Sequence, residues 1–117
     1  MNSEFKKKLQ KQEGWYAEGE NFDLLVARTK EDGKYQYTLS VSISRKHKLY
    51  KKARKQTVEF IRELFYEVAV LGGYDSCEDE KDGSLMVMRY HFPKNFNSLD
   101  KAIKCMESVF NYLFYIK

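Results

Sequence analysis

The alternation of polar and apolar residues is clearest between residues 35 and 44. One face of this segment is apolar, with Tyr35, Tyr37, Leu39, Val41 and Ile43, and the other is polar throughout. A period of two predicts a β-strand that buries one face. Residues 22–29 are expected to form the preceding strand, because Asp32 and Gly33 between the two segments are typical of a tight hairpin turn.

A different period begins at Leu49 and continues to Leu71. Apolar residues recur there at steps of three and four, at Tyr50, Ala53, Thr57, Phe60, Ile61, Leu64, Val68 and Leu71. This spacing predicts one amphipathic helix that buries the stripe. Gly72 and Gly73 are expected to end it.

The last third of the chain predicts another hairpin and another helix. Asp82 and Gly83 mark the turn, and the return strand alternates Met86, Met88, Tyr90 and Phe92 against Leu85, Val87, Arg89 and His91. Pro93 is expected to end that strand. Ser98 is placed to cap a terminal helix, whose core stripe is Leu99, Ala102, Ile103, Met106, Phe110 and Leu113.

The two halves of the chain are similar in pattern. The Asp-Gly pair at 32 and 33 returns at 82 and 83, and "LFY" occurs at 64–66 and again at 113–115. We therefore expect an α+β fold in which a ββα unit is used twice. Two such units would form a four-stranded antiparallel sheet with both helices on one face.

The chain is expected to form a single domain, since 117 residues allow one core. Within it, residues 1–14 are predicted to be a peripheral segment with a short N-terminal helix. The first ββα unit would span 15–73, and the second 74–117. The pattern of the whole chain is then a short helix followed by ββαββα.

Composition predicts a soluble, cytoplasmic protein. Aromatic residues make up 15% of the chain, enough large side chains to fill a core. No apolar run approaches the roughly 20 residues that a membrane span needs, and the start lacks the apolar stretch of a secretory signal, so we expect no membrane contact. Cys77 and Cys105 are read as reduced thiols.

Charge is distributed in blocks along the chain. Residues 45–55 hold seven basic residues and no acid, while the remaining residues carry 14 basic and 17 acidic side chains. A run of this density can neutralise several phosphates. An ordinary solvated helix face is the alternative interpretation. The candidate binding residues are Arg45, Lys46, Lys48, Lys51, Lys52, Arg54, Lys55 and Arg62.

The expected partner of this basic segment is a nucleic acid or an acidic, nucleic-acid-handling protein. On one continuous helix, Lys51, Lys55 and Arg62 would lie opposite the core stripe. The acidic segment 75–82 lacks the ligand pattern of a calcium loop and is expected to be a solvated hairpin that balances the basic helix.

No catalytic or metal-binding motif is evident. His47 and His91 have no partners at metal-ligand spacing, and no phosphate loop, nucleophile elbow or HExxH occurs. We therefore expect a protein that is not an enzyme and has no cofactor, as a monomer or homodimer.

The far face of the sheet supports a different interpretation, a structural or dimerisation module. Its predicted residues mix hydroxyl groups with aliphatic side chains: Leu25, Ala27, Thr38, Ser40, Ser42, Leu85, Val87, Arg89 and His91.

A short helix followed by ββαββα resembles the LAGLIDADG homing endonucleases. The segment "GWYAEG" at 14–19 is similar to the end of that family's helix, where an acidic residue before the final glycine binds the catalytic metal. The resemblance implies a DNA endonuclease, active or degenerate, with Glu18 as the metal ligand and Gly19 after it.

The chain also resembles small phage and mobile-element proteins that inhibit CRISPR nucleases, the anti-CRISPR proteins. A Cas9 inhibitor of that type has a Lys-rich start, then "GWY" before a hairpin that contains "GKY". Here those motifs stand at 14–16 and 33–35. This resemblance implies a Cas nuclease as partner. The leading hypothesis is a noncatalytic binding protein that uses its basic helix face.

Overall fold

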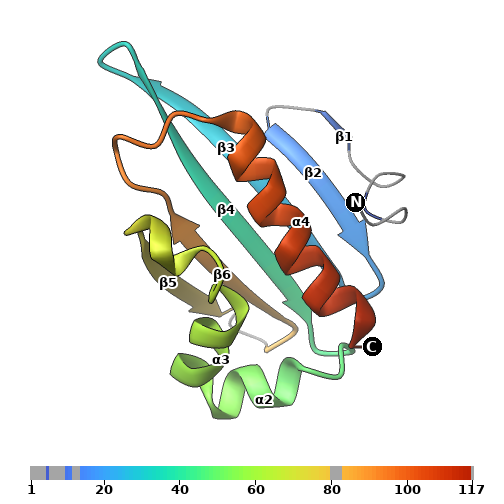
Figure 1. Cartoon of the computed structure of the whole chain (residues 1–117). Coiled ribbons are helices and arrows are strands. Elements are labelled where there is room, and N and C mark those ends of the chain that lie inside the picture. Colours follow the sequence, from blue (N-terminus) through green and yellow to red (C-terminus); the bar gives the residue numbers. More distant parts are fainter. Residues whose placement is uncertain (1–4, 6–9, 12–13, 80–82, 117) are drawn as a thin grey trace.

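The computed structural model describes residues 5, 10–11, 14–79 and 83–116 (Figure 1). Of the expected N-terminal helix, Phe5, Gln10 and Lys11 are described; Gln10–Lys11 pair with β2 as a strand, so the prediction is wrong there, and the rest lies outside the described residues. The elements are β1 Gln10–Lys11, β2 Gly14–Gly19, β3 Phe22–Glu31, β4 Lys34–Ser44, α2 Tyr50–Lys55, α3 Thr57–Leu64, a 3₁₀ turn η1 Ala69–Leu71, β5 Tyr74–Asp79, β6 Leu85–His91 and α4 Leu99–Tyr115.

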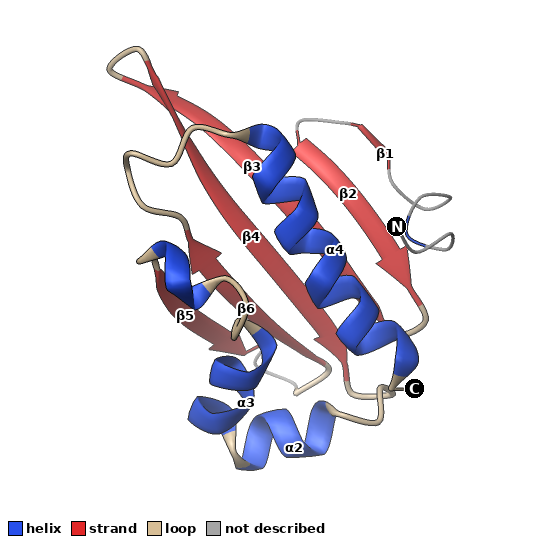
Figure 2. Cartoon of the chain, viewed as in Figure 1, coloured by secondary structure: helices blue, strands red, loops and turns tan. Residues whose placement is uncertain are grey.

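The fold is α+β, as predicted, with one antiparallel sheet in the order β1-β2-β3-β4-β6-β5. Helices α3 and α4 lie on one face of this sheet, whereas α2 lies beyond the lower ends of its strands, so the expected layout of one helix per ββα unit on one face is only partly correct (Figure 2). The expected four strands were too few, because the described sheet has five strands of six or more residues plus the two-residue β1. The additional long strand is β2, which pairs with β3 from Gly14 opposite Ala27 to Gly19 opposite Phe22.

The predicted β3–β4 hairpin is confirmed. Asp32 and Gly33 have φ angles of 52° and 79°, and they connect the paired residues Glu31 and Lys34. Two successive positive φ angles are what a two-residue hairpin turn needs to match the twist of its strands. The return strand of the second hairpin is also confirmed, since Met86, Met88 and Tyr90 of β6 are buried.

The predicted helix over residues 50–71 is wrong in its continuity. Gln56 has φ −127° and ψ 55°, which separates α2 from α3, and η1 follows as a third piece. A straight helix of that length would be about 33 Å long. The seven residues of β6 below it span only about 23 Å. The chain therefore turns at Gln56, and Gly72, with φ 83°, ends the segment.

Each hairpin is covered by the helical segment that follows the other hairpin (Figure 1). Helix α4 follows β5–β6 but crosses β2, β3 and β4, where Phe110 contacts Phe22 with ring centres 5.2 Å apart. The α3–η1 segment follows β3–β4 but packs on β6, where the Tyr90 hydroxyl donates to the Val68 carbonyl at 2.9 Å. This exchange joins the two halves into one core.

Helix α4 begins as its sequence predicts. The Ser98 side chain accepts a hydrogen bond from the Lys101 amide at 3.3 Å, and the buried stripe consists of Ala102, Met106, Val109, Phe110 and Leu113. Among the described residues, no helix combines the length and the apolar composition that crossing a membrane requires.

Candidate nucleic-acid interface

The basic segment is anchored by His47, the one titratable side chain other than tyrosine that is buried in the described core, with 4% of its surface exposed. Its Nδ1 accepts a hydrogen bond from the Leu49 amide at 3.1 Å, and its Nε2 lies 3.2 Å from the Leu113 carbonyl. These partners require a neutral ring with the proton on Nε2. Burial lowers the pKa of His47, which keeps the ring neutral.

Tyr50 fixes α2 against the β5–β6 turn. Its hydroxyl donates to the carbonyl of Gly83, the first described residue after the acidic segment, and accepts from Arg54 Nη1 at 3.2 Å. The Arg54 guanidinium also lies 5.8 Å from the centre of the Tyr50 ring. Gly83 thus lies beside the basic segment, and Arg54 is engaged there.

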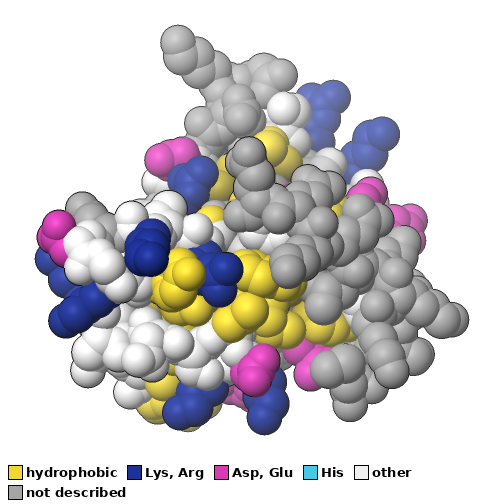
Figure 3. Space-filling model, turned by 90° about the horizontal axis from the view of Figure 1, so that it is seen from above, with side chains coloured by type: hydrophobic (Ala, Val, Ile, Leu, Met, Phe, Trp, Pro, Cys, Tyr) yellow, Lys and Arg dark blue, Asp and Glu magenta, His cyan; other side chains and the backbone are white. Residues whose placement is uncertain are grey.

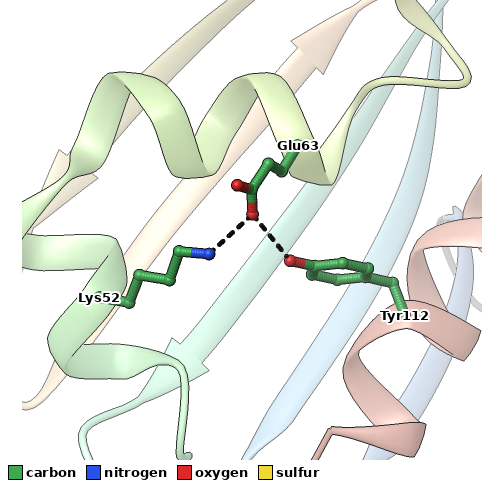
Figure 4. A network of polar contacts seen from close by, with 3 residues as sticks. All are labelled: Lys52, Glu63 and Tyr112. Carbon is green, nitrogen blue, oxygen red and sulfur yellow. Dashed lines mark hydrogen bonds and ion pairs between the residues drawn. The ribbon is translucent and has the colours of Figure 1, made fainter.

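Lys52 belongs to a polar network that connects α2, α3 and α4 (Figure 4). Its Nζ lies 2.9 Å from Glu63 Oε2 on α3, and the same oxygen accepts from the Tyr112 hydroxyl of α4 at 3.2 Å. The hydrogen bond from Lys52 lowers the pKa of Glu63. Lys52 is therefore held by Glu63, whereas the sequence predicted that its side chain would be available to bind a partner.

Six of the predicted contact residues are exposed in the loop after β4 and on α2, and five of them remain when Arg54, which contacts Tyr50, is set aside. We call these side chains the basic corner: Arg45, Lys46, Lys48, Lys51 and Lys55. They lie at the lower end of the molecule in Figure 1. Arg62 is exposed as well, but on α3. The break at Gln56 places it on a different helix from Lys51 and Lys55, so the predicted single basic helix face is wrong.

The predicted far face of the sheet is confirmed in its composition. Leu25, Thr38, Ser40 and Val87 are half-buried there, and no described helix covers them. Asp23 lies on the same face. Burial raises the pKa of its carboxyl, a hydrogen bond with Ser42 opposes the increase, and nearby Glu18 adds to it.

Glu18 is not at a helix end, contrary to what the LAGLIDADG resemblance implied. It lies in β2 and pairs with Asp23 of β3. Among the described residues, no three His, Cys, Asp or Glu side chains gather as metal ligands do. Arg89 and His91 of this sheet face have partners: Arg89 Nη1 lies 2.9 Å from Glu78 Oε2, and the His91 ring stacks on Tyr74 with ring centres 4.5 Å apart.

Tyr35 was assigned to the core from its place in the alternating strand, and this assignment is wrong. Its side chain is 40% exposed, because the β3–β4 hairpin extends beyond the helices. The Arg28 guanidinium lies 4.3 Å from the centre of the Tyr35 ring and 5.0 Å from that of Trp15. The sequence signal for this cluster was present in "GWY" and "GKY", which contribute one aromatic residue each.

The chemistry available at these surfaces is that of binding through charge and aromatic contact. No known protein family, curated protein or solved structure matches the chain.

Proposed function

We propose that the protein is a noncatalytic binding protein whose basic corner engages nucleic acid or a protein that handles nucleic acid. The observation that carries the proposal is the concentration of the five exposed cations of the basic corner within residues 45–55, where no acidic residue occurs. Charge of this density attracts phosphates regardless of base sequence. Nucleic acid is the partner that this property favours.

Rigidity of the basic corner supports the same proposal. Lys46 and Lys48 flank the buried His47, and Lys51 lies on a helix that is held by Tyr50 and Lys52. Because these contacts hold the backbone in place, only the lysine side chains would lose conformational freedom on binding. The conformational entropy lost on binding is then smaller than for a disordered basic tail.

A CRISPR nuclease is one specific form of the proposed partner. It rests on the resemblance of "GWY" at 14–16 and "GKY" at 33–35 to anti-CRISPR proteins. Such a nuclease carries nucleic acid and presents channels that bind phosphates. An inhibitor with a basic corner could contact the bound nucleic acid or an acidic surface of the protein.

The test compares two double variants with the same change in charge. Lys51→Glu with Lys55→Glu alters the basic corner, and Lys101→Glu with Lys104→Glu alters exposed lysines of α4. Binding to a labelled oligonucleotide is measured by fluorescence anisotropy, after melting curves have shown that both variants are folded. We expect the first pair to weaken binding at least tenfold and the second to have a much smaller effect.

Pull-downs from a bacterial lysate, with and without nuclease treatment, then separate the two kinds of partner. A protein partner is retained after nuclease treatment, whereas one bridged by nucleic acid is lost. Equal losses of affinity in the two double variants would contradict a specific role for the basic corner. So would unchanged binding by the first.

A further inference from the structure

The second cluster of cations and aromatic rings lies at the opposite end of β4. Arg28 and Lys30 of β3 lie beside Tyr35, with Lys30 Nζ 5.8 Å from the centre of its ring. Ten residue steps along β4 separate Lys34 from Ser44, where the basic corner begins, or about 33 Å. Figure 3 looks down on this end of the molecule and shows hydrophobic side chains exposed between Lys and Arg side chains.

A cavity of about 430 Å³ adjoins this cluster. It exists because β6 pairs with β4 only over residues 38–44, so that β4 continues past the end of its neighbour. The loop after β6 borders the space, tied to β4 by a hydrogen bond from the Phe92 amide to the Tyr37 carbonyl at 3.1 Å. The lining residues are Asp32, Lys34, Tyr35, Gln36, Lys94 and Asn95. We call this cavity the β4 notch.

The side chains of the notch are free to bind a ligand. Within the described part of the chain, Lys34, Gln36, Lys94 and Asn95 form no side-chain hydrogen bond or ion pair. The strand order puts Arg28 and the notch on opposite sides of β4. Tyr35 therefore stands between a cation that orients its ring and a cavity of a size usual for small ligands.

We propose that the β4 notch binds one unpaired nucleotide of a single-stranded nucleic acid, with its base on Tyr35. Stacking on an aromatic ring accepts any base, and the Asn95 amide, in the loop after β6 that lines the notch, can donate to and accept from a base edge. Lys34 and Lys94 would neutralise the neighbouring phosphates and outweigh the carboxylate of Asp32. A base in a duplex is stacked on both sides and paired at its edge, so it is excluded.

This inference rests on the proposed function and extends it, because it selects single strands over duplexes. The experiment measures the affinity of the whole protein for a labelled single-stranded oligonucleotide and for the duplex made from it. Tyr35→Ala is the test variant, Tyr35→Phe keeps the ring, and Tyr66→Ala removes a tyrosine elsewhere that is even more accessible, at 76% exposed against 40% for Tyr35. Lys94→Gln probes the notch from a separate loop.

We expect Tyr35→Ala to weaken single-strand binding about tenfold and duplex binding less than twofold, with Tyr35→Phe close to wild type. Lys94→Gln should weaken single-strand binding severalfold. Trp15 is the one tryptophan of the chain and lies beside Arg28, so its fluorescence should change on binding the single strand but not the duplex.

Four outcomes would overturn the inference. If Tyr35→Ala and Lys94→Gln bind the single strand like wild type, the notch is not a site. If Tyr35→Ala weakens single-strand and duplex binding equally, the tyrosine does not select unpaired bases. If wild type binds neither oligonucleotide, both this inference and nucleic-acid binding by the basic corner fail. Loss of binding in the Lys51 and Lys55 variant alone, with Tyr35→Ala unaffected, would leave the proposed function intact and refute the notch.

Discussion

His47 should make folding stability depend on pH in a way that one substitution removes. The buried ring must be neutral to accept from the Leu49 amide and donate to the Leu113 carbonyl, and burial lowers the pKa of His47. In the unfolded chain its pKa is about 6.5. As pH falls below that value, the unfolded state therefore binds a proton that the folded state does not.

The sign and size follow from linkage between protonation and folding. The contribution of His47 is fully present well above the unfolded pKa and is lost as pH falls through the lower, folded pKa. The loss can reach about 1.4 kcal/mol per pH unit between those two values. His47→Gln leaves the Leu49 amide and the Leu113 carbonyl with poorer hydrogen-bond partners. It should lower the free energy of unfolding by about 1–3 kcal/mol near pH 8.

Urea denaturation followed by tryptophan fluorescence, at constant ionic strength from about pH 8 to pH 5, measures this difference. The gap in unfolding free energy between wild type and His47→Gln should narrow as the pH falls. Other titrating groups are present in both proteins and largely cancel in the comparison. A gap that stays constant across this range would refute the assignment of a buried neutral ring.

Three further predictions concern the core, a helix cap and a thiol. Phe60→Ala and Phe110→Ala should each cost about 3–5 kcal/mol, because both side chains are fully buried, while the exposed Tyr66→Ala should stay within about 0.5 kcal/mol in the same urea titrations. Costs below about 1 kcal/mol for both phenylalanines would mean the helix faces are wrong. Ser98→Ala should lower stability by about 1 kcal/mol through loss of the α4 cap, and Ser98→Asp should restore it; an unchanged melting temperature in Ser98→Ala would argue against the cap. Burial raises the pKa of the Cys105 thiol to about 11, so a Cys77→Ser variant should react with iodoacetamide near pH 8 on the order of 100-fold more slowly than free cysteine. Rapid alkylation of the folded variant would contradict a protonated, half-buried Cys105.

Sequence patterns predicted the elements whose one face is buried along their whole length. β4 and β6 follow strict alternation because helices cover the same side of both, and α4 follows its stripe from Ala102 to Leu113. β2 was missed because its alternation of apolar and polar residues is weak. Glycines occupy both ends of the strand, and Ala17 is its one fully buried side chain. The pairing with β3, which no local pattern reveals, makes it a strand.

The helix break and the partners of the cations depended on contacts between distant segments. The period of three to four residues runs through Gln56 without interruption, so the sequence alone gave no sign of a turn there. Lys52 and Arg54 look like the other basic residues until the fold brings Glu63 and the Gly83 turn beside them. The exposure of the cations in the basic corner was predictable, because residues 45–55 contain no acidic residue that could pair with them.

The salt dependence of nucleic-acid binding tests the role of the basic corner most directly. Lys48→Gln, Lys51→Gln and Lys55→Gln together remove three exposed charges without introducing repulsion. Each phosphate contact contributes about 0.7 to the slope of log affinity against log salt for a single strand. If all three lysines contact phosphates, the variant's slope should be shallower than that of wild type by about 2. A folded variant with the wild-type slope would contradict the account and make the basic corner an ordinary solvated surface.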